Sequence, residues 1–185
     1  APVTSFTFAA YDSLKVLSSK KNDSPHEASR PFDLDRDGFV LGEGAGMVIL
    51  EELEHAQKRN AYIYAEIIGY GATSGAYHMV IPDPSGDDAA RVMRLAIEEA
   101  NINPEDIDYI NAHGTSTKVN DRVETQAIKA IFGKYAYQVP ISSTKSMIGH
   151  LIGAAGGVEL IAPLLAMQNN LIPPTINYVT KDPEC

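Results

Sequence analysis

The sequence predicts an α/β fold in which helices pack against a mostly parallel sheet. Three observations support this prediction. Apolar segments with strand character alternate three times with amphipathic segments of helical period after residue 61, as in βαβ units. A glycine- and alanine-rich helix follows the last predicted strand. The chain has 185 residues, of which 44% are hydrophobic, so it is long enough to bury a substantial core.

The first 60 residues contain two predicted helices. Residues 5–19 carry apolar side chains near helical spacing, and the polar residues 18–25 end that helix. Residues 53–60 predict a short charged helix, in which we expect His55 to be solvated.

A glycine-rich stretch lies between these helices, after the turn-forming residues 30–38. Gly42, Gly44 and Gly46 punctuate a β-like segment that runs to Leu50. The glycines allow two interpretations, a phosphate cradle or close backbone packing within a sheet. A bare G-x-G-x-G favours packing.

The remaining elements form the alternating pattern. The predicted strands cover residues 62–71, 107–112 and 139–143, and the predicted helices cover residues 87–100, 120–132 and 153–168. Asp121 and Glu124 fit a capping box at the start of the second of these helices, which Gly133 ends. Pro163 is expected to kink the third, and Pro173 with Pro174 stops the regular structure after it.

Composition excludes several classes of function. The net charge is −9 without a basic run, which argues against nucleic acid or an anionic membrane as partner and leaves a carrier protein or a small molecule. The only cysteine is Cys185, so the sequence predicts no disulfide, and its composition suits a reducing compartment. Glu159 and Pro163 interrupt an apolar run already short for a bilayer span. No leader pattern occurs at residue 1, so we expect a cytoplasmic protein, with an organellar location still open.

The most informative segment runs from Ile141 to Glu159. Glu159 is the only formal charge between Lys145 and Lys181, and a buried carboxylate there needs a partner. Lys145 is the nearest candidate in sequence, and His150 lies between them. His113 also follows a predicted strand. Because parallel strands end at one edge of a sheet, we expect His113 and His150 to share one cleft.

Three chemistries were weighed for these residues. Two histidines without a third ligand at suitable spacing argue against a metal site. Ser142 and Lys145 match the S-x-x-K of serine acylases, but the companion S-D-N and K-T-G motifs are absent. The interpretation that remains is a pair of imidazoles, supported by Lys145 and Glu159, that donates hydrogen bonds to a developing oxyanion or enolate.

Four motifs in this order carry a resemblance to a known family. They are Arg36–Gly46, Asn111–Thr117, Ser142–Gly156 and Pro173–Asn177. The chain resembles a β-ketoacyl-acyl-carrier-protein synthase of the elongating type II class. The resemblance implies a layered αβαβα thiolase-like fold, with the end of the N-terminal repeat in residues 1–60 and most of the C-terminal repeat, without its last strands, in residues 61–185.

The resemblance also implies roles for individual residues. In such enzymes a cysteine takes the acyl group, malonyl carrier protein loses CO₂, and the carbanion attacks the thioester. His113 and His150 would be the active-site histidines, with Lys145 and Glu159 behind them. Substrate-binding residues would be two hydroxyls for the pantetheine arm and one aromatic ring lining the cleft: Thr115, Thr117 and Phe39. No cofactor is implied beyond the phosphopantetheine of acyl carrier protein, which is the expected partner, and the full-length enzyme would be a homodimer.

The chain departs from the family pattern in ways that leave alternatives open. The nucleophilic cysteine and the closing Gly-Phe-Gly-Gly-Thr-Asn segment are absent, which indicates a fragment. Val80 replaces the threonine of Tyr-His-Met-Thr, and Gly75 stands where aspartate is common. We therefore keep two alternatives beside a condensing enzyme: a non-condensing partner subunit or decarboxylase-like homologue without the cysteine, and a serine acylase acting through Ser142 and Lys145.

Overall fold

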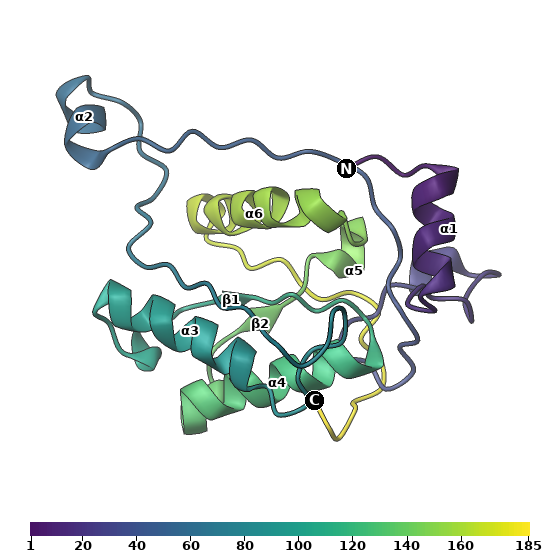
Figure 1. The fold of residues 1–185 in the computed structure, drawn as a ribbon. Coiled ribbons are helices and arrows are strands. Elements are labelled where there is room, and N and C mark those ends of the chain that lie inside the picture. The colour runs from purple at the N-terminus through teal and green to yellow at the C-terminus, as the bar shows by residue number, and fades with distance from the viewer.

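The computed structural model describes all residues from 1 to 185 and has three layers in its C-terminal part. Figure 1 shows the two short strands between α6 on one side and α3 with α4 on the other. The α-helices are α1 Ser5–Ser13, α2 Leu53–Lys58, α3 Asp87–Ala100, α4 Lys118–Phe132, α5 Lys145–Ile148 and α6 Ala155–Asn169. The strands are β1 Ile110–Asn111 and β2 Ile141–Ser142. Short 3-10 helices occur at Pro25–Glu27, Pro104–Asp106, Gly133–Tyr137 and Ile152–Ala154.

The two strands pair in parallel, with Ile110 opposite Ile141 and Asn111 opposite Ser142. The expectation that residues 107–112 and 139–143 share one sheet is therefore confirmed, although both strands are shorter than predicted. Because parallel strands end at the same edge, the loops after them start side by side. His113 follows the first strand and Lys145 follows the second.

The core lies between α4, α3 and the strands. Its buried centre is Ile128, Phe132 and Val139, and α3 covers this centre with Met93 and Ile97. The predicted apolar face of residues 87–100 forms α3 with the same bounds. Two acidic residues in its first turn complement the positive end of the helix dipole.

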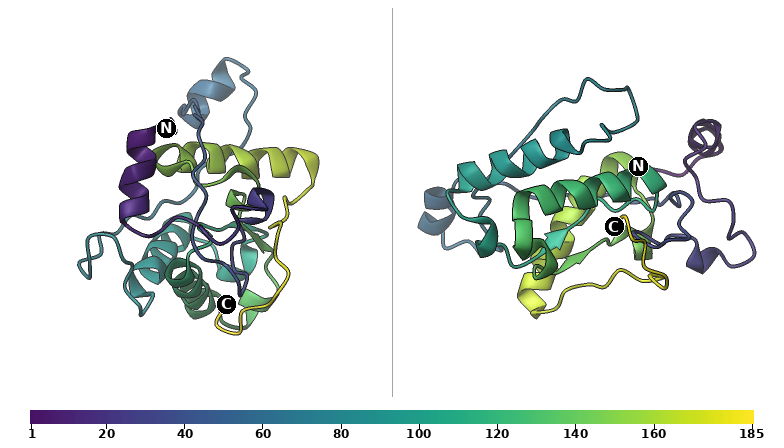
Figure 2. Two further views of the ribbon diagram at one scale, coloured as in Figure 1. Left: turned by 90° about the vertical axis from the view of Figure 1, so that its right-hand side faces the viewer. Right: turned by 90° about the horizontal axis from the view of Figure 1, so that it is seen from below.

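Two predicted strands are not formed. Residues 42–50 and 62–71 belong to no strand, because isolated backbone hydrogen bonds, such as those of Gly42 to His150 and of Gly44 to Ala1, do not continue into a ladder. Figures 1 and 2 show this part of the chain running away from the layers to α2 and back. The predicted helix at residues 53–60 is confirmed as α2, with His55 mostly exposed and beside Glu51.

The glycine-rich stretch serves close packing, as the sequence favoured, but against helices rather than within a sheet. A Cβ at Gly42 would lie 2.3 Å from the Ile148 carbonyl oxygen, and one at Gly46 would lie 2.6 Å from the Gly157 carbonyl carbon. Side chains at either position would push the segment off α5 and α6. No helix in the structure is long and apolar enough to cross a bilayer.

Candidate active site

The loop after β1 carries His113 and is tied to α4. The backbone N–H groups of His113 and Gly114 donate to the two carboxylate oxygens of Glu124, at 2.6 and 2.7 Å. Gly114 has φ +38°, and a Cβ there would lie 2.5 Å from that of Ser143. The loop can therefore approach β2 only with glycine at this position.

The loop after β2 carries His150. Helix α5 ends at Gly149, which has φ +73°, and His150 follows in a short parallel bridge with Leu41. Its N–H donates to the Val40 carbonyl at 2.7 Å, and its carbonyl accepts from Gly42 at 3.0 Å. The glycine-rich stretch therefore holds the second histidine in place.

The two imidazole rings meet. The ring centroids of His113 and His150 lie 5.3 Å apart at an interplanar angle of 87°. Phe39 packs edge-on against His150 at 5.1 Å. The Nδ1 of His150 accepts from the Ile152 N–H at 3.0 Å, which assigns its proton to Nε2. The expected proximity of the histidines is confirmed.

Both rings are neutral near neutral pH. Burial lowers the pKa of His113 to about 4, and the positive charge of Lys145 and then the neighbouring His150 add to this shift. Burial and then Lys145 lower the pKa of His150 to about 4 as well. A neutral imidazole can donate one hydrogen bond to a developing negative charge without acting as a strong acid.

Lys145 lies behind the histidines with its side chain 1% exposed, and it forms an ion pair with Glu159 of α6. The carbonyl of Glu159 accepts from the Asn111 side chain at 2.9 Å, which ties α6 to the end of β1. The expected Lys145–Glu159 pairing is confirmed. No group of three or more His, Cys, Asp or Glu side chains converges at metal-binding distance.

The hydroxyls of Thr115 and Thr117 bond to each other at 2.9 Å. Thr117 is also the N-cap of α4, since its Oγ1 accepts from the Asn120 N–H. The predicted capping box of Asp121 and Glu124 is therefore wrong, because α4 begins three residues before Asp121. Both carboxylates instead accept N–H groups from the loops beside the helix, a role that the sequence reasoning missed.

The Ser142–Lys145 pair does not have the geometry of a serine acylase. Ser142 lies in β2 rather than at a helix start, and its Oγ bonds to the Tyr109 hydroxyl at 2.8 Å. Lys145 is engaged by Glu159.

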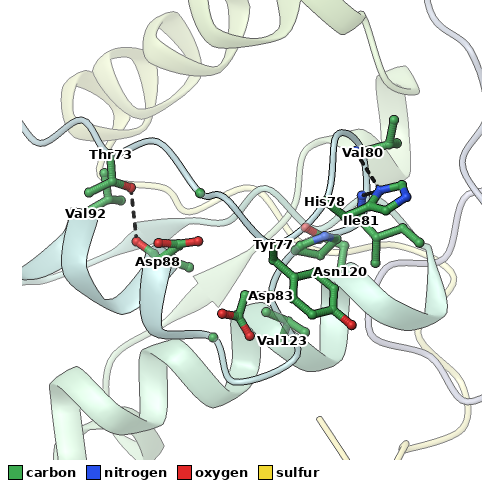
Figure 3. A pocket seen from close by; sticks show the side chains of 14 residues that line it. Thr73, Tyr77, His78, Val80, Ile81, Asp83, Asp88, Val92, Asn120 and Val123 are labelled. Atoms are coloured by element: carbon green, nitrogen blue, oxygen red, sulfur yellow. Dashed lines mark hydrogen bonds between the residues drawn. The ribbon is translucent and has the colours of Figure 1, made fainter.

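A separate cavity of about 410 Å³ lies beside α3 and the start of α4 (Figure 3). Tyr77, His78 and Val80 line it, so the segment that departs from the family motif faces this space. The carboxylate of Asp88 occupies the place that a side chain at residue 75 would take, 2.4 Å from an ideal Cβ at Gly75. Neither active-site histidine lines the cavity.

Two family models match the chain. Residues 64–179 match the C-terminal domain of β-ketoacyl synthases, and residues 1–56 match the N-terminal domain. The chain belongs to the β-ketoacyl synthase family. The exact boundary drawn between residues 60 and 61 stays a prediction.

The chain is similar in sequence to individual curated synthases. It is 51% identical over 185 residues to the 3-oxoacyl-[acyl-carrier-protein] synthase 2 of Synechocystis and 52% identical over 182 residues to that of Coxiella burnetii. These matches cover 100% and 98% of this chain but 44% of each relative. The chain therefore spans less than half the length of these relatives.

Solved structures show the thiolase-like layered fold. A β-ketoacyl synthase from Burkholderia phymatum superposes with a TM-score of 0.93 at 43% identity, covering 100% of this chain and 44% of that one. A type II polyketide ketosynthase, solved in complex with its acyl-carrier protein, superposes with a TM-score of 0.96 at 43% identity, covering 100% and 45%.

Proposed function

We propose that this chain carries the two-histidine part of the active site of an elongating β-ketoacyl synthase. The reaction is the decarboxylative Claisen condensation of malonyl-acyl carrier protein with an acyl thioester, in fatty acid or polyketide synthesis. The observation that carries the proposal is the pair of neutral imidazoles, His113 and His150, 5.3 Å apart in a chain of this family.

The rings support the step in which malonyl thioester loses CO₂. The electron pair of the breaking carbon–carbon bond moves into the α-carbon and thioester carbonyl, so negative charge develops on the thioester oxygen. Imidazole N–H groups that donate to this oxygen stabilise the enolate, and one such donor is worth about 3 kcal/mol of barrier. The α-carbon then attacks the acyl thioester carbonyl and expels the sulfur as a thiolate, giving the β-ketoacyl thioester and the free thiolate.

Lys145 and Glu159 support this step by acting on the two imidazole rings. The positive charge of Lys145 disfavours protonation of both rings, and the carboxylate of Glu159 in α6 forms an ion pair with this ammonium group. Glu159 thereby removes the cost of a buried, unpaired ammonium group.

The acyl-carrying thiol of the proposed reaction is not Cys185. Burial raises the pKa of its thiol, which disfavours the nucleophilic thiolate. We therefore expect the 185-residue chain by itself to form no condensation product.

Acyl carrier protein is the proposed partner, by analogy with the ketosynthase that was solved in complex with one. We propose that Thr115 and Thr117 bind the pantetheine arm and that Phe39 lines the site beside His150. A homodimer, a cytoplasmic location and the lack of any further cofactor belong to the same proposal.

The test is CO₂ release from malonyl-acyl carrier protein by the purified chain. We expect slow decarboxylation that falls about 100-fold in His113→Ala and in His150→Ala, since each removes one oxyanion donor. Cys185→Ala should leave the rate unchanged. Equal rates in the wild type and the double histidine variant would overturn the proposal. Formation of β-ketoacyl product that is lost in Cys185→Ala would show that Cys185 carries the acyl group after all.

A further inference from the structure

The loop that carries His113 contains a buried residue in an unfavourable backbone conformation. Ser116 has φ +68°, a left-handed value that is unfavourable for a non-glycine residue, and its exposed fraction is 0%. Such a residue persists only where its surroundings hold it. Three contacts do so here: its N–H donates to Asp121, its Oγ accepts from the Arg30 N–H, and its carbonyl accepts from the Gly38 N–H.

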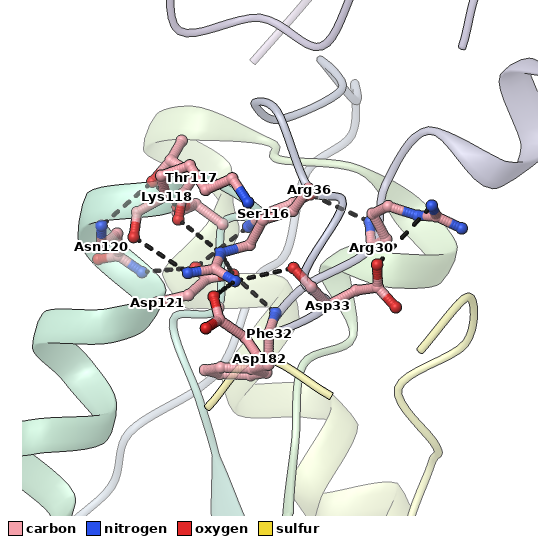
Figure 4. Close-up of polar contacts among 12 residues, drawn as sticks. Arg30, Phe32, Asp33, Arg36, Ser116, Thr117, Lys118, Asn120, Asp121 and Asp182 are labelled. Carbon is pink, nitrogen blue, oxygen red and sulfur yellow. Dashed lines mark hydrogen bonds and ion pairs between the residues drawn. The ribbon is translucent and has the colours of Figure 1, made fainter. Parts of the chain in front are cut away.

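Arg36 lies beside this loop with its guanidinium almost fully buried. Its Nε donates to the Thr117 carbonyl at 3.2 Å, and one terminal nitrogen donates to the Lys118 carbonyl at 3.1 Å. The other terminal nitrogen donates to Asp182 at 2.6 Å. Asp121 lies 3.4 Å from Nε (Figure 4). The guanidinium therefore joins the start of α4 to the C-terminal segment through hydrogen bonds on two sides.

Asp33 closes this arrangement. Its carbonyl accepts from Arg36 at 2.8 Å, and one carboxylate oxygen accepts the N–H groups of Val179 and Thr180, both at 2.7 Å. Although burial opposes the charge, these N–H groups and that of Asp35 lower the pKa of the Asp33 carboxyl. We call Arg36 together with Asp33, Asp121 and Asp182 the arginine clamp.

The contacts of the clamp lead more directly to His113 than to His150, whose neighbouring segment they reach through the Gly38 N–H bond to Ser116. His113 is bonded through its N–H to Glu124 of α4, and Arg36 holds the start of that helix. His150 is held by the backbone at Val40 and Gly42. Residues 37–39 have anchors of their own, through the Asp37 carboxylate to the loop at residues 18–20 and through a bridge between Phe39 and Leu17.

We infer that Arg36 and Asp121 are positioning residues that place the His113 ring against the His150 ring. They act by fixing the start of α4 and the left-handed backbone at Ser116. The catalytic meaning of this placement rests on the proposed function, whereas the placement itself does not.

The test is an NMR titration of the histidine rings in the 185-residue chain. Arg36→Met removes every hydrogen bond of the guanidinium. Arg36→Lys keeps the charge beside Asp121 and Asp182 but cannot bond all of its partners at once. Asp121→Asn keeps the shape and removes the charge. The matched control is Arg122→Met. It removes an arginine of α4 whose guanidinium pairs at 3.5 Å with Glu184 at the surface.

We expect the pKa of His113 to rise by about one unit in Arg36→Met and Asp121→Asn and by less in Arg36→Lys, because a displaced ring becomes better solvated. Cross-peaks between the two rings should weaken in the same order. The pKa of His150 should change less than that of His113, because the backbone at Val40 and Gly42 still holds His150. Arg122→Met should change the pKa of neither ring. A purely structural clamp would shift both rings together as the fold loosens.

Two outcomes would overturn the inference. One is an unchanged His113 in Arg36→Lys and Asp121→Asn, and the other is a common shift of both histidines in every clamp variant. If Arg36→Met fails to fold, these two conservative variants decide. Decarboxylation is not part of this measurement, so a failure of the proposed function would leave its result unaffected.

Discussion

The loop around Ser116 and the stretch from residue 47 to residue 70 are opposites. Arg36 and Asp121, which hold the first, are 1% and 0% exposed, and their polar groups have hydrogen-bond partners within the chain. In the second, Met47 and Ile49 are 90% and 89% exposed although they are apolar. Hydrogen bonds from buried side chains to backbone groups that lie close in space can satisfy the polar groups of a site within this chain. An apolar segment with strand character, in contrast, forms a strand only when another strand pairs with it.

The largest expected effect comes from breaking the buried region. Asp121→Ala removes one of the two carboxylates beside Arg36, leaving Asp182, and it leaves the N–H groups of Phe32 and Ser116 without acceptors. Removing one partner from a buried pair costs about 3–5 kcal/mol, and we expect a loss of this size in urea unfolding. Asp12→Ala, which removes an exposed partner of Lys15, is the control and should change the unfolding free energy by less than about 0.5 kcal/mol. Equal losses in both variants would contradict the contrast.

A smaller loss is expected from Glu124→Gln. Both carboxylate oxygens accept backbone N–H groups, so either orientation of the amide places its NH₂ against a donor. Leaving one such donor unsatisfied costs about 1–3 kcal/mol in unfolding free energy. The control is Glu98→Gln on the exposed side of α3, which should be neutral. A neutral Glu124→Gln would show that the His113 loop does not depend on this carboxylate.

The sequence predicted features that depend on neighbouring residues and missed those that depend on the folded loops, such as the acceptor role of Glu124. The 87–100 helix was predicted to the residue because its apolar period is a local property. The motifs also identified both histidines and the Lys145–Glu159 pair, which the structure brings together. The acceptor role of Glu124 was not predictable, because it depends on the turn at Gly114 and Ser116 that brings loop N–H groups over the helix. The predictions of strands at residues 42–50 and 62–71 were wrong for a different reason. A strand forms only when another strand pairs with it, and the local apolar pattern does not specify that partner.

Acidification should lower the unfolding free energy, because His113 and His150 are held neutral in the folded chain. His113 and His150 have pKa values of about 4 in the folded chain, against 6.5 for an ordinary histidine. The unfolded chain therefore binds more protons than the folded chain between pH 6.5 and pH 4. The contribution of the two histidines to the unfolding free energy is fully present above pH 6.5 and is lost as the pH falls through this window. Because water reaches part of each ring, we expect about 1 kcal/mol for the pair.

Chemical unfolding at several pH values checks this expectation. The double variant His113→Asn and His150→Asn should lose that part of the pH dependence, whereas His26→Asn, whose ring is 81% exposed, should retain it. A double variant with the same pH dependence as the wild type would show that the rings are not held neutral by folding.

The smallest effect is expected in the exposed region, where Ile49→Lys should leave the unfolding free energy of the monomer within about 0.5 kcal/mol. At 89% exposure the isoleucine side chain already lies in water, so lysine forfeits almost no burial. Exposed apolar segments with strand character promote association, so the variant should also be more soluble and its sedimentation less concentration-dependent. Asn60→Lys, at an exposed polar position just after α2, adds the same charge and should change solubility less. A loss above about 1 kcal/mol at a concentration where the chain is monomeric would mean that residue 49 is packed in solution, and the contrast between the two regions would then be wrong.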